Sequence, residues 1–341
     1  MINHTYPDKY LGETELMFDT IPTVPTADEI LDRSFRRAAK KMRDKKNKDR
    51  ANEEFVMAVT QAVHDKLVSI IQSFPEFDTL PPFYRDLVDI LYGIEEMRKA
   101  FGGVGWAAKH TRDIGKDLAR SMRRSPENLA IRKQAVARIA SIVHQIDKDL
   151  RFLNDARNVL RKLPVVSSDE FTIVVAGYPN VGKSSFIRLV STATPQVASY
   201  PFTTKGVIVG HHELSWRERV QFIDTPGILD AGNNRERNKI ERQALNALIY
   251  VADTILFIID PSEHCGYDLT TQELLLEEIK GFAHVPVIVC ANKSDLAPYP
   301  GVLNMSTVTG EGVLEVLAAT LRERTPTTTP RPADTLPENP E

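Results

Sequence analysis

The spacing of apolar residues changes near residue 165. Before that point apolar residues recur every three or four positions, which predicts amphipathic helices. We predict helices over 86–101 and 106–124, and one long helix over 126–161. After that point, short apolar runs typical of strands alternate with helical segments, a pattern that predicts an α/β domain. The sequence therefore predicts an all-α helical bundle followed by an α/β domain.

The α/β half predicts a mostly parallel six-stranded sheet. Runs 206–211 and 219–224 have no helix between them, so we expect them to pair antiparallel. The predicted strands are 171–176, 206–211, 219–224, 254–260, 285–292 and 301–306. The predicted helices of this half are 183–193, 235–251, 269–281 and 311–323. We expect a helical domain over 1–165, an α/β domain over 166–324, and a disordered Pro- and Thr-rich tail over 325–341.

Charge separates the same two halves. Residues 1–165 hold 29 Lys and Arg against 24 Asp and Glu, whereas residues 166–341 hold 14 against 22. Segment 33–50 contains ten basic and two acidic residues, and the predicted helix 106–124 carries one aligned basic face. That face consists of Lys109, Arg112, Lys116, Arg120 and Arg123. It favours a polyanionic partner, with an ordinary solvated helix face as the plain alternative.

Several classes are disfavoured. The two cysteines, Cys265 and Cys290, have no metal-ligand spacing, so neither a disulfide framework nor a zinc site is expected. The N-terminus has no signal-peptide pattern, and no apolar run reaches the roughly 18 residues of a membrane span. We therefore expect a cytoplasmic protein without membrane contact.

A phosphate-binding loop follows the first predicted strand of the α/β half. The stretch GYPNVGKS matches GxxxxGK[ST] between a strand and a helix, the context that this motif requires. Lys183 should reach the β- and γ-phosphates, and Ser184 should bind Mg²⁺. The residues expected to contact the nucleotide here are Gly177, Tyr178, Pro179, Asn180, Val181, Gly182, Lys183, Ser184 and Ser185.

The stretch NKSD, residues 292–295, selects the base. Asp295 can accept hydrogen bonds from N1–H and the exocyclic amine of guanine, a donor pair that adenine lacks, so GTP and GDP are the expected nucleotides. Asn292 and Lys293 should support the base and the loop. Ser306 and Thr307 in MSTVTGEG are expected near the guanine O6, although Thr stands where Ala is usual.

The stretch DTPGILD contains the γ-phosphate sensor. Asp224 should hold Mg²⁺ through water, and the Gly227 N–H should meet the γ-phosphate. Thr204, with Thr203 as the alternative, should complete Mg²⁺ coordination when the γ-phosphate is present, which would make a switch. The best-known small GTPases have a catalytic Gln after this Gly, but this chain has Ile228, so a slow intrinsic rate is expected.

Asn180 is a candidate to compensate for the missing Gln. Its side-chain oxygen could help to bind K⁺ beside the β,γ-bridge, where the cation would neutralise developing charge. The catalytic set that we predict is Lys183, Thr204, Gly227 and Asn180. The plain alternative is that Asn180 only caps the loop.

These residues together resemble the Obg-related GTPases. Within that group the chain resembles the nucleolar-GTP-binding-protein family of ribosome-assembly factors, in its short archaeal form. The supporting stretches are IPTVPTADEILD (21–32), FPEFDTLPPFYRDLVDILYG (74–93), GYPNVGKSSF (177–186), FTTKGVIVGH (202–211), RNKIERQALNAL (237–248) and DPSEHCGY (260–267). The resemblance implies association with maturing large ribosomal subunits, and a hydrophobic residue in place of the catalytic Gln.

Two functions therefore remain open. In one, the chain is a GTP-controlled assembly factor whose helical half binds ribosomal RNA of the large-subunit precursor. In the other, the helical half of the GTPase binds protein partners or dimerises. A monomer is favoured, and no DNA partner is expected. Tyr84, Tyr92 and Trp106 are candidates for stacking on bases, with core packing the more ordinary role.

Overall fold

The computed structural model describes residues 18–42, 48–123, 128–167, 169–198, 206–215, 218–224 and 251–324. These residues form two compact units. A helical unit contains residues 18–79 and 92–161, and an α/β unit contains residues 80–91 and 162–324. The chain therefore does not divide between its units at a single position.

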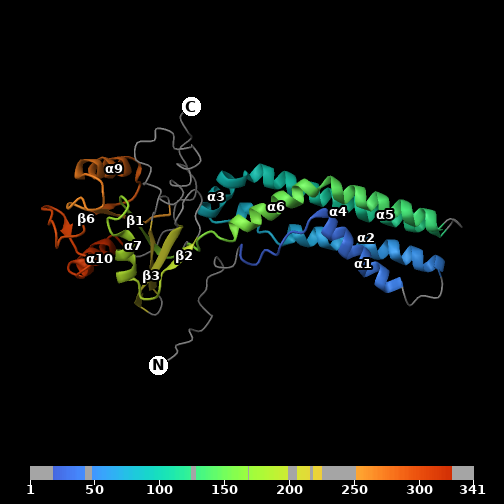
Figure 1. The fold of residues 1–341 in the computed structure, drawn as a ribbon, viewed down its shortest axis with the longest axis horizontal. Helices are drawn as coiled ribbons and strands as arrows, with labels where there is room; N and C mark the ends of the chain where they lie inside the picture. Colours follow the sequence, from blue (N-terminus) through green and yellow to red (C-terminus); the bar gives the residue numbers. More distant parts are fainter. Residues whose placement is uncertain are drawn as a thin grey trace, which may run out of the picture. The chain divides into compact units, whose positions relative to one another are not determined.

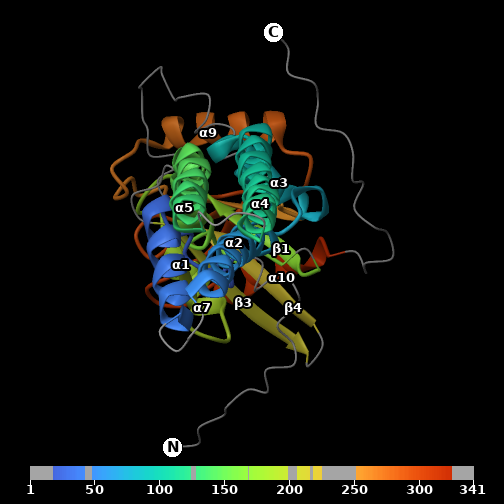
Figure 2. The same ribbon diagram turned by 90° about the vertical axis from the view of Figure 1, so that its right-hand side faces the viewer.

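The helical unit is built from long amphipathic helices. Figures 1 and 2 show α1, α2, α4 and α5 side by side, with α6 following α5 along the chain. Their buried stripes meet in a core to which α2 contributes Val59, Val63, Leu67 and Ile70. The elements are α1 (Ala27–Met42), α2 (Lys48–Gln72), η2 (Phe77–Thr79), α4 (Ile94–Met122), α5 (Asn128–Gln145) and α6 (Asp147–Leu160).

A reciprocal cap begins α1. The backbone N–H of Thr26 donates to Glu29 Oε2 at 3.0 Å, and the Glu29 N–H donates to Thr26 Oγ1 at 3.4 Å. A second cap comes from a residue far along the chain: Asp147 Oδ1 accepts the Ala27 N–H at 2.8 Å. Capping of this kind satisfies donors that have no partner within the helix. The start of α1 is thereby fixed to the start of α6.

Two predicted helix boundaries in this half are wrong. The helix predicted over 86–101 is interrupted at Gly93, whose φ of 72° lies in the left-handed region, and α4 then runs without a break through the glycine-rich stretch 102–105. The single helix predicted over 126–161 is divided at Ile146, where φ is −100° and ψ is 10°. Ile146 stays in the core, so the apolar stripe continues across the break and gives no sign of it.

The α/β unit contains a sheet with the strand order β2-β3-β4-β1-β5-β6-β7. Strands β4, β1, β5, β6 and β7 run parallel to one another, while β3 pairs antiparallel with both β2 and β4. The antiparallel pair predicted from 206–211 and 219–224 is confirmed. The strands are β1 (Phe171–Ala176), β2 (Gln196–Ala198), β3 (Val207–Ser215), β4 (Glu218–Asp224), β5 (Thr254–Ile259), β6 (Val287–Ala291) and β7 (Leu303–Asn304).

The expected number of six strands is too low for the described residues. The additional strand is β2, which has only three residues, all exposed or half-buried. It lies at the edge of the sheet and pairs only with β3. Because an exposed three-residue edge strand buries no apolar face, it leaves no periodic pattern in the sequence.

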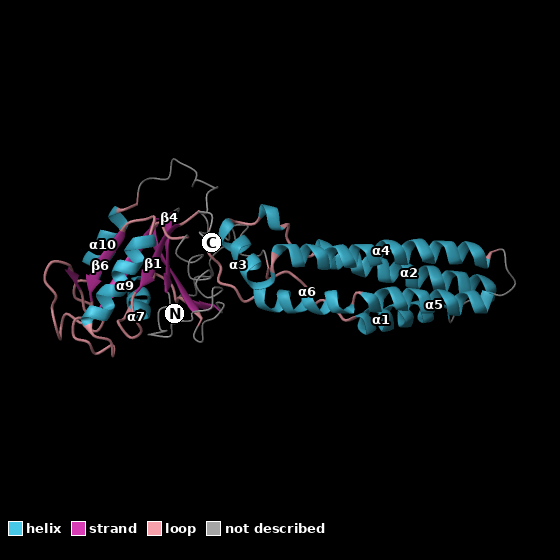
Figure 3. Ribbon diagram, turned by 90° about the horizontal axis from the view of Figure 1, so that it is seen from above, coloured by secondary structure: helices cyan, strands magenta, loops and turns pink. Residues whose placement is uncertain are grey.

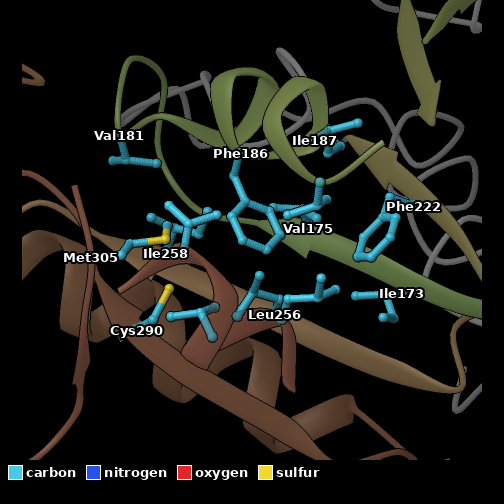
Figure 4. Packing of buried hydrophobic residues seen from close by; sticks show 14 of the residues in the cluster. Ile173, Val175, Val181, Phe186, Ile187, Phe222, Leu256, Ile258, Cys290 and Met305 are labelled. Atoms are coloured by element: carbon cyan, nitrogen blue, oxygen red, sulfur yellow. The ribbon is translucent and has the colours of Figure 1, made fainter. Parts of the chain in front are cut away.

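Helices cover both faces of this sheet. Figures 1 and 3 show α9 (Leu269–Phe282) on one face, with α7 (Lys183–Val190) and α10 (Val313–Arg322) on the other. Under α7, the rings of Phe186 and Phe222 meet edge to face with their centroids 6.2 Å apart. Figure 4 shows Phe186 directed from α7 onto the sheet, close to Val175 and Leu256. This core fixes α7, and therefore the loop that precedes it.

Helix α3 (Pro82–Tyr92) joins the α/β unit through Tyr84. The Tyr84 hydroxyl donates to the Pro164 carbonyl at 3.0 Å and accepts the Val166 N–H at 2.7 Å. Burial raises the pKa of Tyr84 to about 12.

In the described part of the chain, no helix combines the length and the apolarity needed to cross a membrane.

Candidate nucleotide-binding site

The loop 177–182 connects the end of β1 with the start of α7, as the sequence predicts. Its backbone enters the left-handed region at Gly177 (φ 138°), Asn180 (φ 59°) and Gly182 (φ 107°). A Cβ at Gly177 would lie 2.4 Å from the Ile258 carbonyl oxygen, so only glycine fits there. Asn is one of the few other residues that adopt this conformation readily. The shape of the loop therefore requires glycine at position 177 and favours the Asn at position 180.

Lys183 folds back over this loop. Its ammonium donates to the carbonyl oxygens of Gly177 and Tyr178, both at 2.9 Å, and the residue is 6% exposed. A buried ammonium needs acceptors close by. Phosphate oxygens in the loop are suitable replacements for these carbonyls, which makes Lys183 a group ready to receive an anion.

Ser184 and Asp224, both predicted as Mg²⁺ residues, are in direct contact. The Ser184 hydroxyl, in the first turn of α7, donates to Asp224 Oδ2 at the end of β4. Asp224 is fully buried. A hydroxyl and a carboxylate beside a phosphate loop are the hard oxygen ligands that Mg²⁺ prefers. The residues present therefore fit a magnesium ion.

Asn292 connects its own turn with the phosphate loop and with the segment around Thr307. Its Nδ2 donates to the Val181 carbonyl at 2.7 Å and to Thr307 Oγ1 at 3.1 Å, while its Oδ1 accepts the Thr307 N–H at 3.0 Å. The same side chain leaves no room for a Cβ at residue 182, because that atom would lie 2.0 Å from Asn292 Nδ2. Gly182, like Gly177, must therefore be glycine. The base turn, the phosphate loop and the segment around Thr307 are thus held together.

The remaining base-side residues have distinct environments. Asp295 is exposed in its turn. Ser306 is buried, and its Oγ accepts the N–H groups of Val308 at 3.3 Å and Thr309 at 3.2 Å. Its side chain therefore shapes its own loop. Lys293 has a left-handed backbone (φ 62°) and forms an ion pair with Asp260 at 2.5 Å.

Other predicted residues divide into two groups. Val181 is fully buried under the loop, Pro179 and Tyr178 are half-buried, and Asn180 and Ser185 are exposed. Thr203, Thr204, Gly227 and Ile228 lie outside the described residues, and their roles stay predictions.

Sequence reasoning missed Asp260 and Gln272. Asp260 follows β5 and is fully buried. Gln272 of α9 is 1% exposed, and its side-chain amide hydrogen-bonds the backbone N–H and carbonyl oxygen of Asp260. The signal for Asp260 is the stretch DPSEHCGY, which also carries part of the family resemblance. An acidic residue at the end of a buried strand marks Asp260 as a candidate site residue, although not as the partner of Lys293.

The basic face of α4 divides into two parts. Arg120 pairs with Asp117 at 2.9 Å, and Arg123 pairs with Glu53 at 2.6 Å. The other three cations line a groove of about 310 Å³ between α2 and α4. The groove is lined by His64, Val68, Ile71, Gly105, Ala108, Lys109, Arg112, Asp113 and Lys116.

The aromatic candidates also differ from one another. Tyr84 is buried, as a core role requires, and Tyr92 donates to the carbonyl oxygen of Asp155 at 3.2 Å. Trp106 is 41% exposed and stacks on His110 with ring centroids 4.5 Å apart, so core packing is the wrong expectation for this residue.

Comparisons with known proteins agree with the two-part organisation. Residues 18–167 match the family model of the NOG1 N-terminal helical domain, and residues 172–293 match that of the 50S ribosome-binding GTPase. The chain is 39% identical to uncharacterized protein MJ1408 of Methanocaldococcus jannaschii over 82% of this chain and 81% of that protein. It is 39% identical to nucleolar GTP-binding protein 1 of Drosophila melanogaster, over 69% of this chain and 36% of that protein. The corresponding protein of Eremothecium gossypii is 33% identical, over 83% of this chain and 45% of that protein.

A phosphate loop between β1 and α7, with an NKSD turn joined to it, defines a P-loop GTPase domain. This domain follows a helical domain in the sequence. The chain belongs to the nucleolar GTP-binding protein 1 family. It spans less than half the length of the Drosophila and Eremothecium relatives that it matches.

Proposed function

We propose that the chain is a GTP-hydrolysing assembly factor for the large ribosomal subunit, and that its helical unit binds ribosomal RNA. The observation that carries the GTP part is the hydrogen bond from Asn292 to Val181, which joins a base-selecting turn to a phosphate loop. The ribosomal part is supported by the names of the matched families and by the basic groove of the helical unit.

In this proposal each loop residue has a task. Lys183 exchanges the carbonyls of Gly177 and Tyr178 for the β- and γ-phosphates, and Asp295 accepts the guanine donors. Ser184 and Asp224, completed by Thr204, hold Mg²⁺, which supplies positive charge beside the phosphates. The Gly227 N–H meets the γ-phosphate, so the segments around Thr204 and Gly227 respond to its loss.

Hydrolysis without a partner is slow in this proposal, because Ile228 cannot orient a water molecule. The partner particle then supplies the missing orientation, and Asn180 with K⁺ neutralises developing charge. The test is GTP turnover by the full chain in potassium buffer, with and without purified large-subunit particles. Stimulation by the particles is expected. A wild-type chain that turns over ATP as fast as GTP would contradict the proposal.

The groove between α2 and α4 is the proposed RNA surface. Lys109, Arg112 and Lys116 line it together with apolar side chains, a combination suited to a sugar–phosphate backbone. We expect Lys109→Glu/Arg112→Glu to weaken RNA binding and to reduce the salt dependence of that binding. The control is Lys133→Glu/Arg138→Glu on α5, which makes the same change of charge away from the groove. Binding to a protein partner or a second copy, insensitive to ribonuclease, would instead favour the other function of the helical half.

A further inference from the structure

The segment 260–267, with the sequence DPSEHCGY and here named the 260–267 loop, has no role in the function proposed above. It begins with Asp260, which is fully buried. Its Oδ1 accepts the Ser262 N–H at 3.1 Å and the Ser262 hydroxyl at 2.5 Å. Its Oδ2 accepts the Cys265 N–H at 2.8 Å and the Lys293 ammonium at 2.5 Å. The carboxylate is thus surrounded by donors.

This environment keeps Asp260 ionised. Burial acts to raise its pKa, but hydrogen bonds from Lys293 and Ser262 outweigh that effect, so the pKa lies below its ordinary value. A buried carboxylate is tolerated when it is paired and hydrogen-bonded in this way. Asp260 is therefore an anionic partner for the Lys293 ammonium.

Lys293 needs such a partner. It is the second residue of the base-selecting turn 292–295, and its backbone lies in the left-handed region (φ 62°), which lysine seldom adopts. The turn also depends on this residue, because the Lys293 carbonyl accepts the N–H groups of Leu296 at 2.8 Å and Ala297 at 3.1 Å. The conformation of Lys293 thus decides where the neighbouring Asp295 lies.

The 260–267 loop is itself held on two sides. Gln272 of α9 accepts the Asp260 N–H at 2.7 Å and donates to the Tyr267 carbonyl at 2.9 Å. The Tyr267 ring stacks on Tyr178 of the phosphate loop, with centroids 4.3 Å apart and an interplanar angle of 32°. The loop therefore joins the helix α9, the phosphate loop and the base turn.

We propose that Asp260 is a positioning residue for guanine recognition, which holds Lys293, and through it the turn 292–295, in the orientation that receives the base. This inference rests on the proposed binding of GTP. In this inference Asp260 acts through Lys293, whereas the phosphates are bound by residues 177–185, which belong to a separate loop. Loss of Asp260 should therefore weaken recognition of the base and leave the phosphate contacts intact.

The test compares GDP with ADP in the full-length Asp260→Asn variant, by displacement of a fluorescent nucleotide. We expect GDP affinity to fall on the order of tenfold, the scale of a hydrogen bond to a charged group, while ADP affinity is unchanged. A merely structural defect would reduce the fraction of binding-competent protein and leave the GDP-to-ADP ratio of affinities as it was. Asp268→Asn is the matched control, since Asp268 caps α9 and Asn is an equally good cap.

A second variant pair tests whether Asp260 acts through Lys293. In a Lys293→Met background, Asp260→Asn should change the GDP-to-ADP ratio no further. Ser262→Ala keeps the carboxylate and removes one donor, and it should narrow the ratio by about twofold to tenfold. This variant serves where Asp260→Asn does not fold.

An unchanged ratio in Asp260→Asn, or in Ser262→Ala where Asp260→Asn does not fold, would overturn the inference, as would full additivity with Lys293→Met. A wild-type chain without preference for GDP over ADP would remove the proposed function and this inference together. A wild-type chain that prefers GDP to ADP, with the same GDP-to-ADP ratio of affinities in Asp260→Asn, would remove this inference alone.

Discussion

The side-chain amide of Asn292 donates to the carbonyl oxygen of Val181 at 2.7 Å, although the two residues are 111 positions apart in the chain. This bond joins the loop 177–182, which we propose to receive the phosphates, to the turn 292–295, which we propose to select the base. Because both groups are buried, the two parts of the site cannot separate without leaving a polar group unsatisfied.

Asn292→Ala should therefore damage both stability and binding. The variant leaves the Val181 carbonyl without its donor, and we expect a loss of about 2 kcal/mol in the free energy of unfolding. GDP affinity should fall by at least about tenfold, because the turn no longer lies on the phosphate loop. Urea denaturation and titration calorimetry measure the two effects. The exposed Asn158→Ala is the control, and an Asn292→Ala variant that binds GDP like the wild type would refute this account of the site.

Ser184→Ala should make GTP binding insensitive to Mg²⁺. The hydroxyl that contacts Asp224 is one of the two described oxygen groups suited to the ion. In Mg²⁺ buffer we expect the GTP affinity of the variant to be at least about tenfold below that of the wild type. When a chelator removes the ion, the GTP affinities of the two proteins should become equal. Ser185→Ala changes an exposed neighbouring hydroxyl and should behave as the wild type. An equal loss for Ser184→Ala with and without Mg²⁺ would argue against the magnesium role.

Asn180 should make hydrolysis sensitive to the monovalent cation. Its position at the exposed edge of the phosphate loop leaves its side chain accessible to an ion. We expect GTP turnover to be faster in K⁺ than in Na⁺, and we expect Asn180→Asp to alter that ratio. Equal rates in the two salts, or an unaltered response in Asn180→Asp, would leave Asn180 with only its role in shaping the loop.

Gly115→Ala should destabilise the helical unit. A Cβ at Gly115 would lie 2.1 Å from Thr60 Oγ1 and 2.8 Å from Thr60 Cβ, so α2 and α4 would have to move apart. We expect a loss of about 1–3 kcal/mol in the free energy of unfolding. Gly102→Ala lies in the same helix with nothing within 4 Å of the added Cβ, and should stabilise by about 0.5–1 kcal/mol. Chemical denaturation of the two variants side by side decides the matter, and equal effects would contradict the described packing.

The phosphate loop and its helix could be predicted because their signal is local. A strand, two required glycines and Lys183 follow one another within a single short segment. The base turn was predictable for the same reason. The class of fold followed from the alternation of strands and helices, including the antiparallel pair of β3 and β4.

Features that depend on contacts between distant segments could not be predicted. The ion pair of Asp260 with Lys293 joins residues 33 positions apart, and neither stretch alone indicates the other. Two helix boundaries were also hidden from the sequence. The break at Ile146 leaves the apolar stripe intact, and the stretch 102–105 stays helical although its glycines favour a break. Helix α3 lies in the sequence of the helical half, but Tyr84 hydrogen-bonds the segment that leads into β1.

The most direct test of the central claim is co-sedimentation of the full chain with large-subunit precursor particles in the presence of guanine or adenine nucleotides. The account predicts binding that depends on the guanine nucleotide, is lost at high salt, and is weakened in Lys109→Glu/Arg112→Glu but not in Lys133→Glu/Arg138→Glu. Binding that is the same with adenine nucleotides, or no binding to these particles in any nucleotide state, would contradict it.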